Sequence, residues 1–344
     1  MLQAIQKELV LRKDYLQGEI ITSIYWGGGT PSLLDPNSVE KILATISHHY
    51  ILAPHLEVTL EANPDDITLE KLKGLYSIGV NRLSIGIQSF QDEVLHYMNR
   101  VHNGKQAYES VRLAQEAGFE NITIDLIYGV PNASPTRWQE DLEKAVALQT
   151  THIAAYCLTI EPKTVFGYRK AQGLLQEMPD EEATQDYKDL IATLTQHGYE
   201  HYEISNFSKP GYPSQHNTNY WKKGNYLGVG PGAHSYNGTH RSANIAHNAQ
   251  YIKDIEQGII PTTVERLTQK DHINEYIMVS LRTQWGCDLH WLHKKYSYDL
   301  QTAQKNYLYQ LQKLNLVTLM DGIILLTPSG KLLADQIARD LFVH

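Results

Sequence analysis

The chain has 344 residues, of which 42% are hydrophobic and 20% are charged, a composition that allows a large core and two domains. Its net charge of −8 argues against non-specific nucleic-acid binding, which needs a basic face. No apolar run is long enough to cross a bilayer, so a cytoplasmic protein is expected. The first residues, 1–16, have the apolar spacing of an amphipathic helix.

A repeated alternation of strands and helices follows, with repeats of about 30 to 40 residues, as in parallel βαβ units. Six strands are too few for a closed eight-unit barrel, so we expect an α/β fold with an open or partial (β/α) barrel. The predicted strands cover residues 20–26, 56–61, 81–88, 121–128, 152–160 and 200–204, with helices at 36–46, 68–77, 104–117, 135–148 and 180–197.

The first predicted strand ends in three consecutive glycines, Gly27 to Gly29, followed by Thr30. Such a cluster costs conformational entropy, which is justified where a turn needs positive φ or where the backbone approaches a ligand. Its place directly after a strand is the place where α/β folds bind ligands. A tight turn without a ligand is the plain alternative.

Polar side chains share one face near the ends of three predicted strands. Alternation places the apolar residues toward the surrounding helices, and Glu61, Gln88 and Asp125 toward the barrel interior. The carboxyl ends of the strands are where such folds place their active sites. Together these residues predict a polar ligand site beside the glycine turn, although each alone is also typical of a satisfied polar group.

The second half of the chain has a different character. Residues 205–236 are rich in glycine and aromatic residues with little predicted regular structure, which indicates a functional segment or a cover over the barrel. From about residue 243 the pattern is mostly helical, and Asp321-Gly322 between two apolar runs predicts a β-hairpin. The predicted helices lie near residues 247–257, 267–283, 288–296 and 299–313, with a final helix to 341.

We therefore expect two domains, a partial barrel over residues 1–242 and a helical, winged-helix-like domain over residues 243–344. A winged helix suggests DNA binding, but the acidic charge and the few basic residues of the last helix favour a docking or lid module.

Six motifs together carry a resemblance to a known family. The chain resembles radical S-adenosylmethionine (SAM) proteins of the oxygen-independent coproporphyrinogen III oxidase group, and among them the shorter HemW-type heme chaperones. The resemblance covers essentially the whole chain. The motifs are Trp-Gly-Gly-Gly-Thr-Pro-Ser at 26–32, Leu-Glu-Ala-Asn-Pro at 60–64, Arg-Leu-Ser-Ile-Gly-Ile-Gln-Ser-Phe at 82–90, Asn-Arg-Val-His at 99–102, Ile-Asp-Leu-Ile-Tyr-Gly-Val-Pro at 124–131 and Tyr-Glu-Ile-Ser-Asn-Phe at 202–207.

The resemblance implies a SAM site. In the family, the glycine turn holds the amino-acid end of SAM and polar residues from later motifs make the other contacts. Arg100, which the strand pattern does not indicate, suits a carboxylate because its planar guanidinium binds two oxygens. The residues that match the family's cofactor contacts are Gly28, Gly29, Thr30, Glu61, Gln88, Arg100 and Asp125.

A second segment, His216-Asn-x-x-Tyr-Trp221, is similar to one associated with heme in the chaperone-type members. Histidine ligates heme iron, and aromatic side chains pack on the porphyrin. The resemblance therefore implies His216 as a heme ligand, with His234 as a weaker candidate. Because the chain has 16 histidines, a loop histidine without a ligand role is the alternative.

The cysteines depart from the family pattern. The family holds a four-iron four-sulfur cluster on a Cys-x3-Cys-x2-Cys motif, and this cluster delivers the electron that cleaves SAM. Only Cys157 and Cys287 are present here, and neither is at a matching position. We expect Met1 to be an internal methionine of a longer protein, or else the chain to be a truncated form without radical chemistry. No catalytic residue is predicted in this chain, and apart from the heme candidate His216 no metal ligand is predicted.

These features predict a heme chaperone that passes heme to an acceptor protein, in a family whose cofactors are SAM, the four-iron four-sulfur cluster and heme. One alternative is an oxygen-independent coproporphyrinogen III oxidase acting on a porphyrinogen. Another is an inactive binding remnant. The oligomeric state does not follow from the sequence.

Overall fold

The computed structural model describes residues 1–131 and 135–344. They form two compact units. The barrel unit comprises residues 23–36 and 57–214, and the terminal unit comprises residues 1–22, 37–56 and 215–344. The domain boundary between residues 242 and 243 stays a prediction. In the described part of the chain, no helix has the length and apolar character needed to span a membrane.

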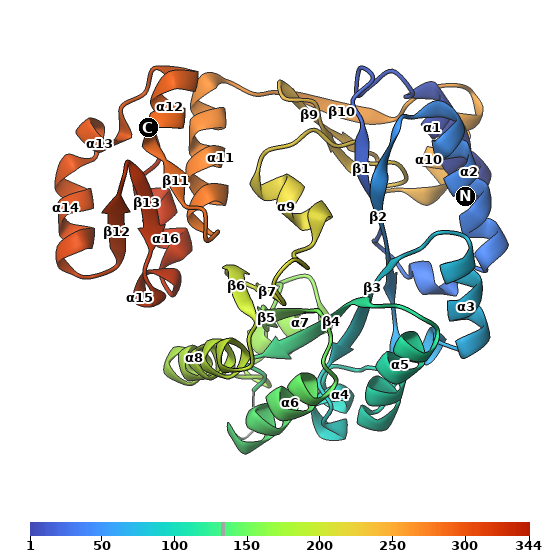
Figure 1. The fold of residues 1–344 in the computed structure, drawn as a ribbon, viewed down its shortest axis with the longest axis horizontal. Helices are drawn as coiled ribbons and strands as arrows, with labels where there is room; N and C mark the ends of the chain where they lie inside the picture. The colour runs from blue at the N-terminus through green and yellow to red at the C-terminus, as the bar shows by residue number, and fades with distance from the viewer. Residues whose placement is uncertain (132–134) are drawn as a thin grey trace. The chain divides into compact units, whose positions relative to one another are not determined.

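A curled seven-stranded sheet is the framework of the fold, with the strand order β1-β2-β3-β4-β5-β7-β6 (Figure 1). Strands β2 to β5 pair in parallel, which confirms the predicted partial (β/α) barrel. The strands are β1 Ile21–Trp26, β2 Leu52–Ala62, β3 Arg82–Gln88, β4 Asn121–Tyr128, β5 His152–Cys157, β6 Glu200–Glu203 and β7 Asn206–Ser208.

Helices cover the outer face of this sheet (Figure 1). The apolar phase of β3 faces them: Leu83, Ile85 and Ile87 are fully buried, and each contributes roughly 1.5–3 kcal/mol by leaving water. Thr68 caps α3 by accepting a hydrogen bond from the backbone N–H of Lys71. The helices of this unit are η1 Pro31–Leu33, η2 Pro64–Asp66, α3 Leu69–Ser77, α4 Asp92–Tyr97, α5 Gly104–Glu116, α6 Pro135–Ala147, α7 Val165–Ala171 and α8 Asp180–Gln196.

The prediction of six strands was wrong by one, because β7 lies between β5 and β6 and is antiparallel to both. The turn that joins β6 to β7 contains neither glycine nor proline. Instead, the Glu203 carboxylate accepts hydrogen bonds from Ser205 N at 3.1 Å and from Asn206 Nδ2 at 2.5 Å. The Glu203 side chain stabilises this turn in place of the usual turn residues. Because those residues are absent, the sequence contains no signal for a hairpin here.

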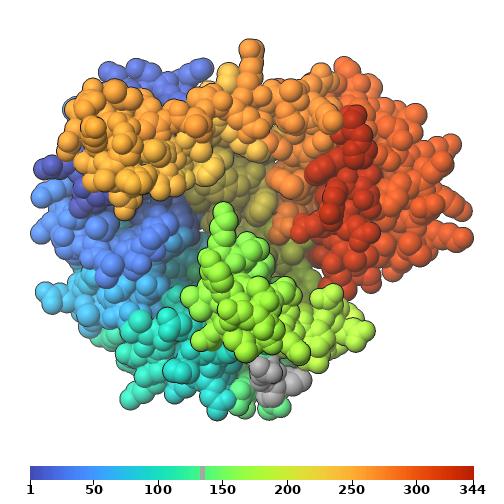
Figure 2. Space-filling model, turned by 180° about the vertical axis from the view of Figure 1, so that it is seen from behind, coloured from blue at the N-terminus to red at the C-terminus, as the bar shows by residue number. Residues whose placement is uncertain are grey.

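In the terminal unit, α1 (Leu2–Leu11) packs on α10 (Asn248–Glu256) through buried Ala4, Tyr251 and Ile255. Figure 2 shows the dark-blue first residues beside the gold residues of α10. The predicted end of the first helix at residue 16 was wrong. The chain leaves the helix at Arg12, whose guanidinium donates a hydrogen bond to the Gly228 carbonyl oxygen at 3.3 Å.

The segment 205–236, predicted to be irregular, contains short elements, and strands also occur where only helices were expected. Strands β8 (His234–Tyr236), β9 (His240–Asn244) and β10 (Thr262–Arg266) form an antiparallel sheet in the order β10-β9-β8. These strands are polar, and β10 is largely exposed. Pairing with neighbouring strands holds them in place. Their sequences lack the alternation of apolar and polar residues that would have predicted strands. Helix α9 covers Gln215–Trp221.

The last part of the terminal unit is helical with a small sheet, as predicted. The hairpin of β12 and β13 is confirmed, with positive φ of 50° at Asp321 and 77° at Gly322, as a two-residue turn of this kind requires. The elements are α11 Gln269–Leu281, β11 Cys287–Asp288, α12 Leu289–Tyr296, α13 Leu300–Ala303, α14 Lys305–Lys313, β12 Val317–Met320, β13 Ile323–Leu326, α15 Pro328–Lys331 and α16 Ala334–Asp340.

Candidate functional site

The glycine turn after β1 uses its glycines for two different reasons. Gly28 and Gly29 have φ of 72° and 68°, and a Cβ on either would meet no atom within 4 Å. Their backbone conformation therefore requires glycine, while the space around them is open. At Gly27 the reason is close approach, because a Cβ there would lie 2.6 Å from the Tyr25 ring and 2.9 Å from Glu61 Oε1.

Glu61 fastens the glycine turn to the end of β2. Its Oε1 accepts a hydrogen bond from the Tyr25 hydroxyl at 2.8 Å, and its Oε2 accepts one from the backbone N–H of Gly28 at 3.2 Å. Burial, together with the neighbouring Glu61 carboxylate, raises the pKa of Tyr25. The phenol therefore stays protonated at neutral pH and remains a donor to Glu61.

Asp125 is the second carboxylate of this site, and it lies within β4, three residues before the strand ends at Tyr128. Burial raises its pKa to about 7, and the nearby charge of Glu61 acts in the same direction. The hydroxyl of Ser84, 3.3 Å from Oδ1, opposes this shift. A carboxylate that is costly to charge in the absence of a ligand is well suited to a ligand that carries positive charge.

Gln88 and Arg100 both lie close to Gly86. A Cβ on Gly86 would come within 2.9 Å of Gln88 Nε2 and 3.6 Å of Arg100 Nη2, so a larger residue would displace them. Arg100 Nη2 donates hydrogen bonds to Asn63 Oδ1 at 2.9 Å and to the Gly86 carbonyl oxygen at 3.2 Å. The register of β3 against β4 shifts between Ile85 and Gln88, which turns the end of β3.

The structure thus groups the residues that the sequence singled out in the barrel unit, and we call them the strand-end cluster. Thr30 precedes η1 and its side chain makes no capping hydrogen bond. The sequence reasoning missed Tyr25 and Asn63 as partners of Glu61 and Arg100, although Asn63 stands in the Leu-Glu-Ala-Asn-Pro motif. The strand-end cluster comprises Gly28, Gly29, Thr30, Glu61, Gln88, Arg100 and Asp125.

His216 belongs to the terminal unit, on α9. Its Nε2 lies 3.0 Å from the Tyr220 hydroxyl, and the two rings meet edge to face with centroids 4.9 Å apart. Burial lowers the pKa of His216 to about 4, so the imidazole is neutral at pH 7. Neutral imidazole is the form that ligates metals. His234, the weaker candidate, is exposed at the start of β8.

The two cysteines do not fit an iron–sulfur cluster. Cys157 is exposed in the barrel unit, and Cys287 is buried in the terminal unit, where burial raises its pKa to about 12. Such a cluster needs several thiolates converging on one point. Among residues 1–131 and 135–344, no three or more His, Cys, Asp or Glu side chains are grouped to hold a metal ion. No chemical step is therefore assigned to a cluster in this chain.

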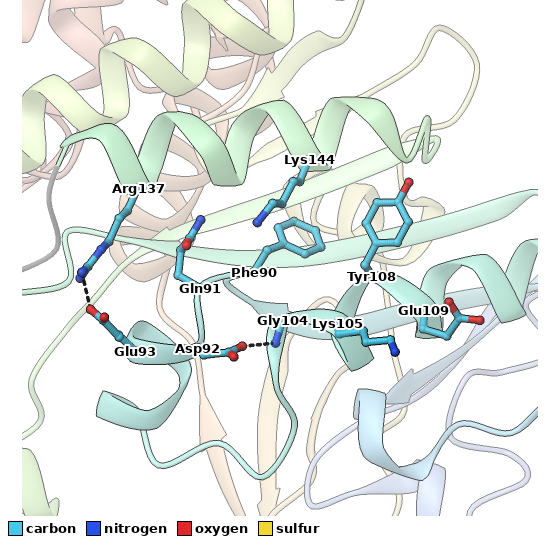
Figure 3. A pocket seen from close by; sticks show the side chains of 10 residues that line it. All are labelled: Phe90, Gln91, Asp92, Glu93, Gly104, Lys105, Tyr108, Glu109, Arg137 and Lys144. Carbon is cyan, nitrogen blue, oxygen red and sulfur yellow. Dashed lines mark hydrogen bonds and ion pairs between the residues drawn. The ribbon is translucent and has the colours of Figure 1, made fainter.

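A separate depression of about 700 Å³ lies on the helical side of the barrel unit (Figure 3). Arg137 forms an ion pair with Glu93 there, and Asp92 accepts a hydrogen bond from the backbone N–H of Gly104 at 2.8 Å. It contains no residue of the strand-end cluster, and two of its charged side chains, Arg137 and Glu93, pair with each other. The strand-end cluster and α9 remain the candidate sites.

Comparisons with known proteins agree with this geometry. The radical SAM superfamily profile matches residues 5–145, and the HemN C-terminal domain profile matches residues 267–333. The heme chaperone HemW of Bacillus subtilis is 34% identical over 98% of this chain and 89% of that protein. HemW of Lactococcus lactis is 40% identical over 78% of this chain and 70% of that protein.

The chain belongs to the HemW family of radical SAM proteins. HemW of Mycobacterium tuberculosis is also similar, at 31% identity over 99% of this chain and 85% of that protein. Coproporphyrinogen III oxidase HemN of Escherichia coli has the same fold, with a TM-score of 0.84 over 99% of this chain and 82% of that chain at 24% identity. The family resemblance and the fold class predicted from the sequence are both confirmed.

Proposed function

We propose that this HemW-family chain is a heme chaperone that binds heme at α9 and passes it to an acceptor protein. The observation that carries the proposal is the 31% to 34% identity, over nearly the whole chain, to proteins named heme chaperones. The neutral imidazole of His216 and the aromatic rings beside it supply the chemistry that a heme ligand needs.

We further propose that the strand-end cluster binds SAM. Gly28, Gly29 and Thr30 would hold its amino-acid end, where Arg100 suits the carboxylate. Asp125 and Glu61 suit its hydroxyl and cationic groups, with Gln88 as a further hydrogen-bonding partner. The raised pKa of Asp125 supports this assignment, because the positive charge of SAM stabilises the charged carboxylate. Bound SAM would supply the family's radical chemistry only together with a cluster.

A heme titration followed by Soret absorbance tests the first proposal. We expect the full chain to bind one heme, and His216→Ala to weaken binding roughly tenfold or more, since a direct iron ligand is lost. The matched control is His234→Ala, which removes an exposed histidine of the same unit and leaves binding unchanged. Equal affinity of His216→Ala and the unchanged chain would contradict the assignment.

The two alternatives predict different results. A coproporphyrinogen III oxidase would convert coproporphyrinogen, but the likeness to HemN at 24% identity shows only the fold. An inactive remnant would be folded and bind neither SAM nor heme. A chaperone binds heme without changing it and gives it up to an acceptor, which transfer to an excess of apomyoglobin measures.

A further inference from the structure

The His216 side chain contacts a second side chain of the same helix, that of Tyr220. Residues four apart lie one above the other on a helix, and here this spacing joins His216 to Tyr220. The hydrogen bond between His216 Nε2 and the Tyr220 hydroxyl is 3.0 Å long. Nε2 of His216 is therefore already hydrogen-bonded to Tyr220, a residue of the same motif.

Tyr220 is held in this position by further aromatic contacts. Its ring meets the Tyr226 ring edge to face, with ring centroids 4.8 Å apart. The ring centroid of Tyr226 is in turn 6.2 Å from that of Tyr236. Tyr226 is also fixed through its backbone, which pairs with that of Tyr236 across a β-bridge. The Tyr220 hydroxyl is thus placed on His216 by the surrounding sheet as well as by the helix.

The C-terminal end of α9 contacts α11 and the residue after it, and these contacts restrain the position of the helix. Trp221 receives the Arg282 guanidinium over its ring at 5.7 Å, and just beyond α9 Lys223 Nζ lies 3.4 Å from Glu275 Oε2. Both partners come from α11 or the residue after it, within the same unit. Because these contacts do not involve Tyr220, we expect a substitution of Tyr220 to leave the position of α9 unchanged.

Iron ligation and this hydrogen bond compete for the same atom. A histidine nitrogen binds iron through its lone pair. If Nε2 carries the proton, it has no lone pair to offer, and if it does not, its lone pair accepts the hydroxyl hydrogen of Tyr220. In either tautomer, iron binding at Nε2 requires the Tyr220 hydroxyl to leave.

We propose that the Tyr220 hydroxyl is a displaceable cap on the iron-binding nitrogen of His216, which weakens heme binding and makes release to an acceptor easier. This inference rests on the proposed heme site at His216. It assigns to the motif His216-Asn-x-x-Tyr-Trp221 a ligand and its competitor four residues apart. A chaperone gains from such a pair because its cargo must also leave.

The variant Tyr220→Phe tests the cap, since it keeps the ring contacts and removes only the hydroxyl. One hydrogen bond of about 0.5 to 1.5 kcal/mol no longer has to be broken, so we expect heme affinity to rise roughly 2- to 10-fold. Heme transfer to apomyoglobin should slow by a similar factor. The control Tyr307→Phe removes a tyrosine–carboxylate hydrogen bond to Asp340 and should change neither.

The double variant His216→Ala/Tyr220→Phe makes the test specific. If the cap acts on His216, removing the hydroxyl has no effect once the imidazole is gone. Weaker or unchanged heme binding by Tyr220→Phe, or a gain that persists without His216, would overturn the cap. If His216→Ala binds heme as well as the unchanged chain, the heme site itself is wrong. If His216→Ala loses binding and Tyr220→Phe gains nothing, only the cap is wrong.

Discussion

The strand-end cluster and α9 differ in how they are built and in the ligand that each suits. The cluster combines the carboxylates of Glu61 on β2 and Asp125 on β4 with the guanidinium of Arg100, and it keeps Asp125 at a raised pKa. On α9, a neutral histidine contacts Tyr220, whose ring in turn packs on Tyr226. The first arrangement suits a small zwitterion with a positive charge, and the second suits a flat apolar ring with a metal centre.

This difference predicts that the affinity for SAM and the affinity for heme are lowered by different substitutions. Arg100→Ala should lower SAM affinity most, roughly 10- to 100-fold, because it removes a charged donor of the kind that contributes about 1.5 to 3 kcal/mol. Equilibrium dialysis with labelled SAM measures the effect. The control is Arg112→Ala, an exposed arginine on α5, and heme binding should be unchanged in both variants. A parallel loss of heme affinity in Arg100→Ala would show that the sites are not separate.

The pH dependence of the two sites should also differ. SAM prefers the charged form of Asp125, so its affinity should rise as pH increases through the pKa of about 7, by about tenfold between pH 6 and pH 8. Asp125→Asn should remove this dependence. Heme binding should be flat over the same range, because the pKa of His216 is about 4. A flat SAM profile in the unchanged chain would contradict the role of Asp125.

The Asp125 carboxyl also makes the stability of the fold depend on pH. Stability should fall as pH rises, whereas SAM affinity should rise. A carboxyl whose pKa is higher in the folded chain binds more protons there, so its contribution to stability is present below pH 4 and falls as pH rises toward 7. Without SAM, Asp125→Asn should therefore stabilise the chain at pH 8, on the order of 1–2 kcal/mol after solvent screening. Thermal unfolding at pH 5 and pH 8 measures it, and an equal effect at both values would contradict the coupling.

The smallest effect is expected at Tyr25. Tyr25→Phe removes one hydrogen bond to Glu61 but leaves the Gly28 amide in place, so SAM affinity should fall roughly 2- to 10-fold. Tyr168→Phe, at an exposed site on α7 of the same unit, is the matched control. Unchanged SAM affinity in Tyr25→Phe would mean that Glu61 does not need its phenol partner.

The sequence predicted the two regions unequally. Strand alternation was enough to predict one shared face for Glu61, Gln88 and Asp125, because side chains on a strand have a period of two. Arg100 follows a short helix and reaches the cluster through Asn63, so no strand pattern could indicate it. The hairpin at Asp321-Gly322 was predictable from its turn residues, whereas the turn at Ser205 depends on the Glu203 side chain.

The region around α9 was harder to predict for a related reason. Strands β8 to β10 are short and polar, and the pairing of β9 with β10 joins residues that lie far apart in the chain, such as His240 and Arg266. The motif contains both His216 and Tyr220, yet the hydrogen bond between them depends on helix formation at α9. The sequence therefore indicated a candidate ligand and gave no sign of the group that competes with iron for it.

Resonance Raman spectroscopy of the full chain, loaded with heme and reduced, detects directly whether His216 ligates the iron. We expect an iron–imidazole stretching band that His216→Ala abolishes and His234→Ala retains. The same band in His216→Ala, or its absence from the unchanged chain, would show that His216 is not the heme ligand.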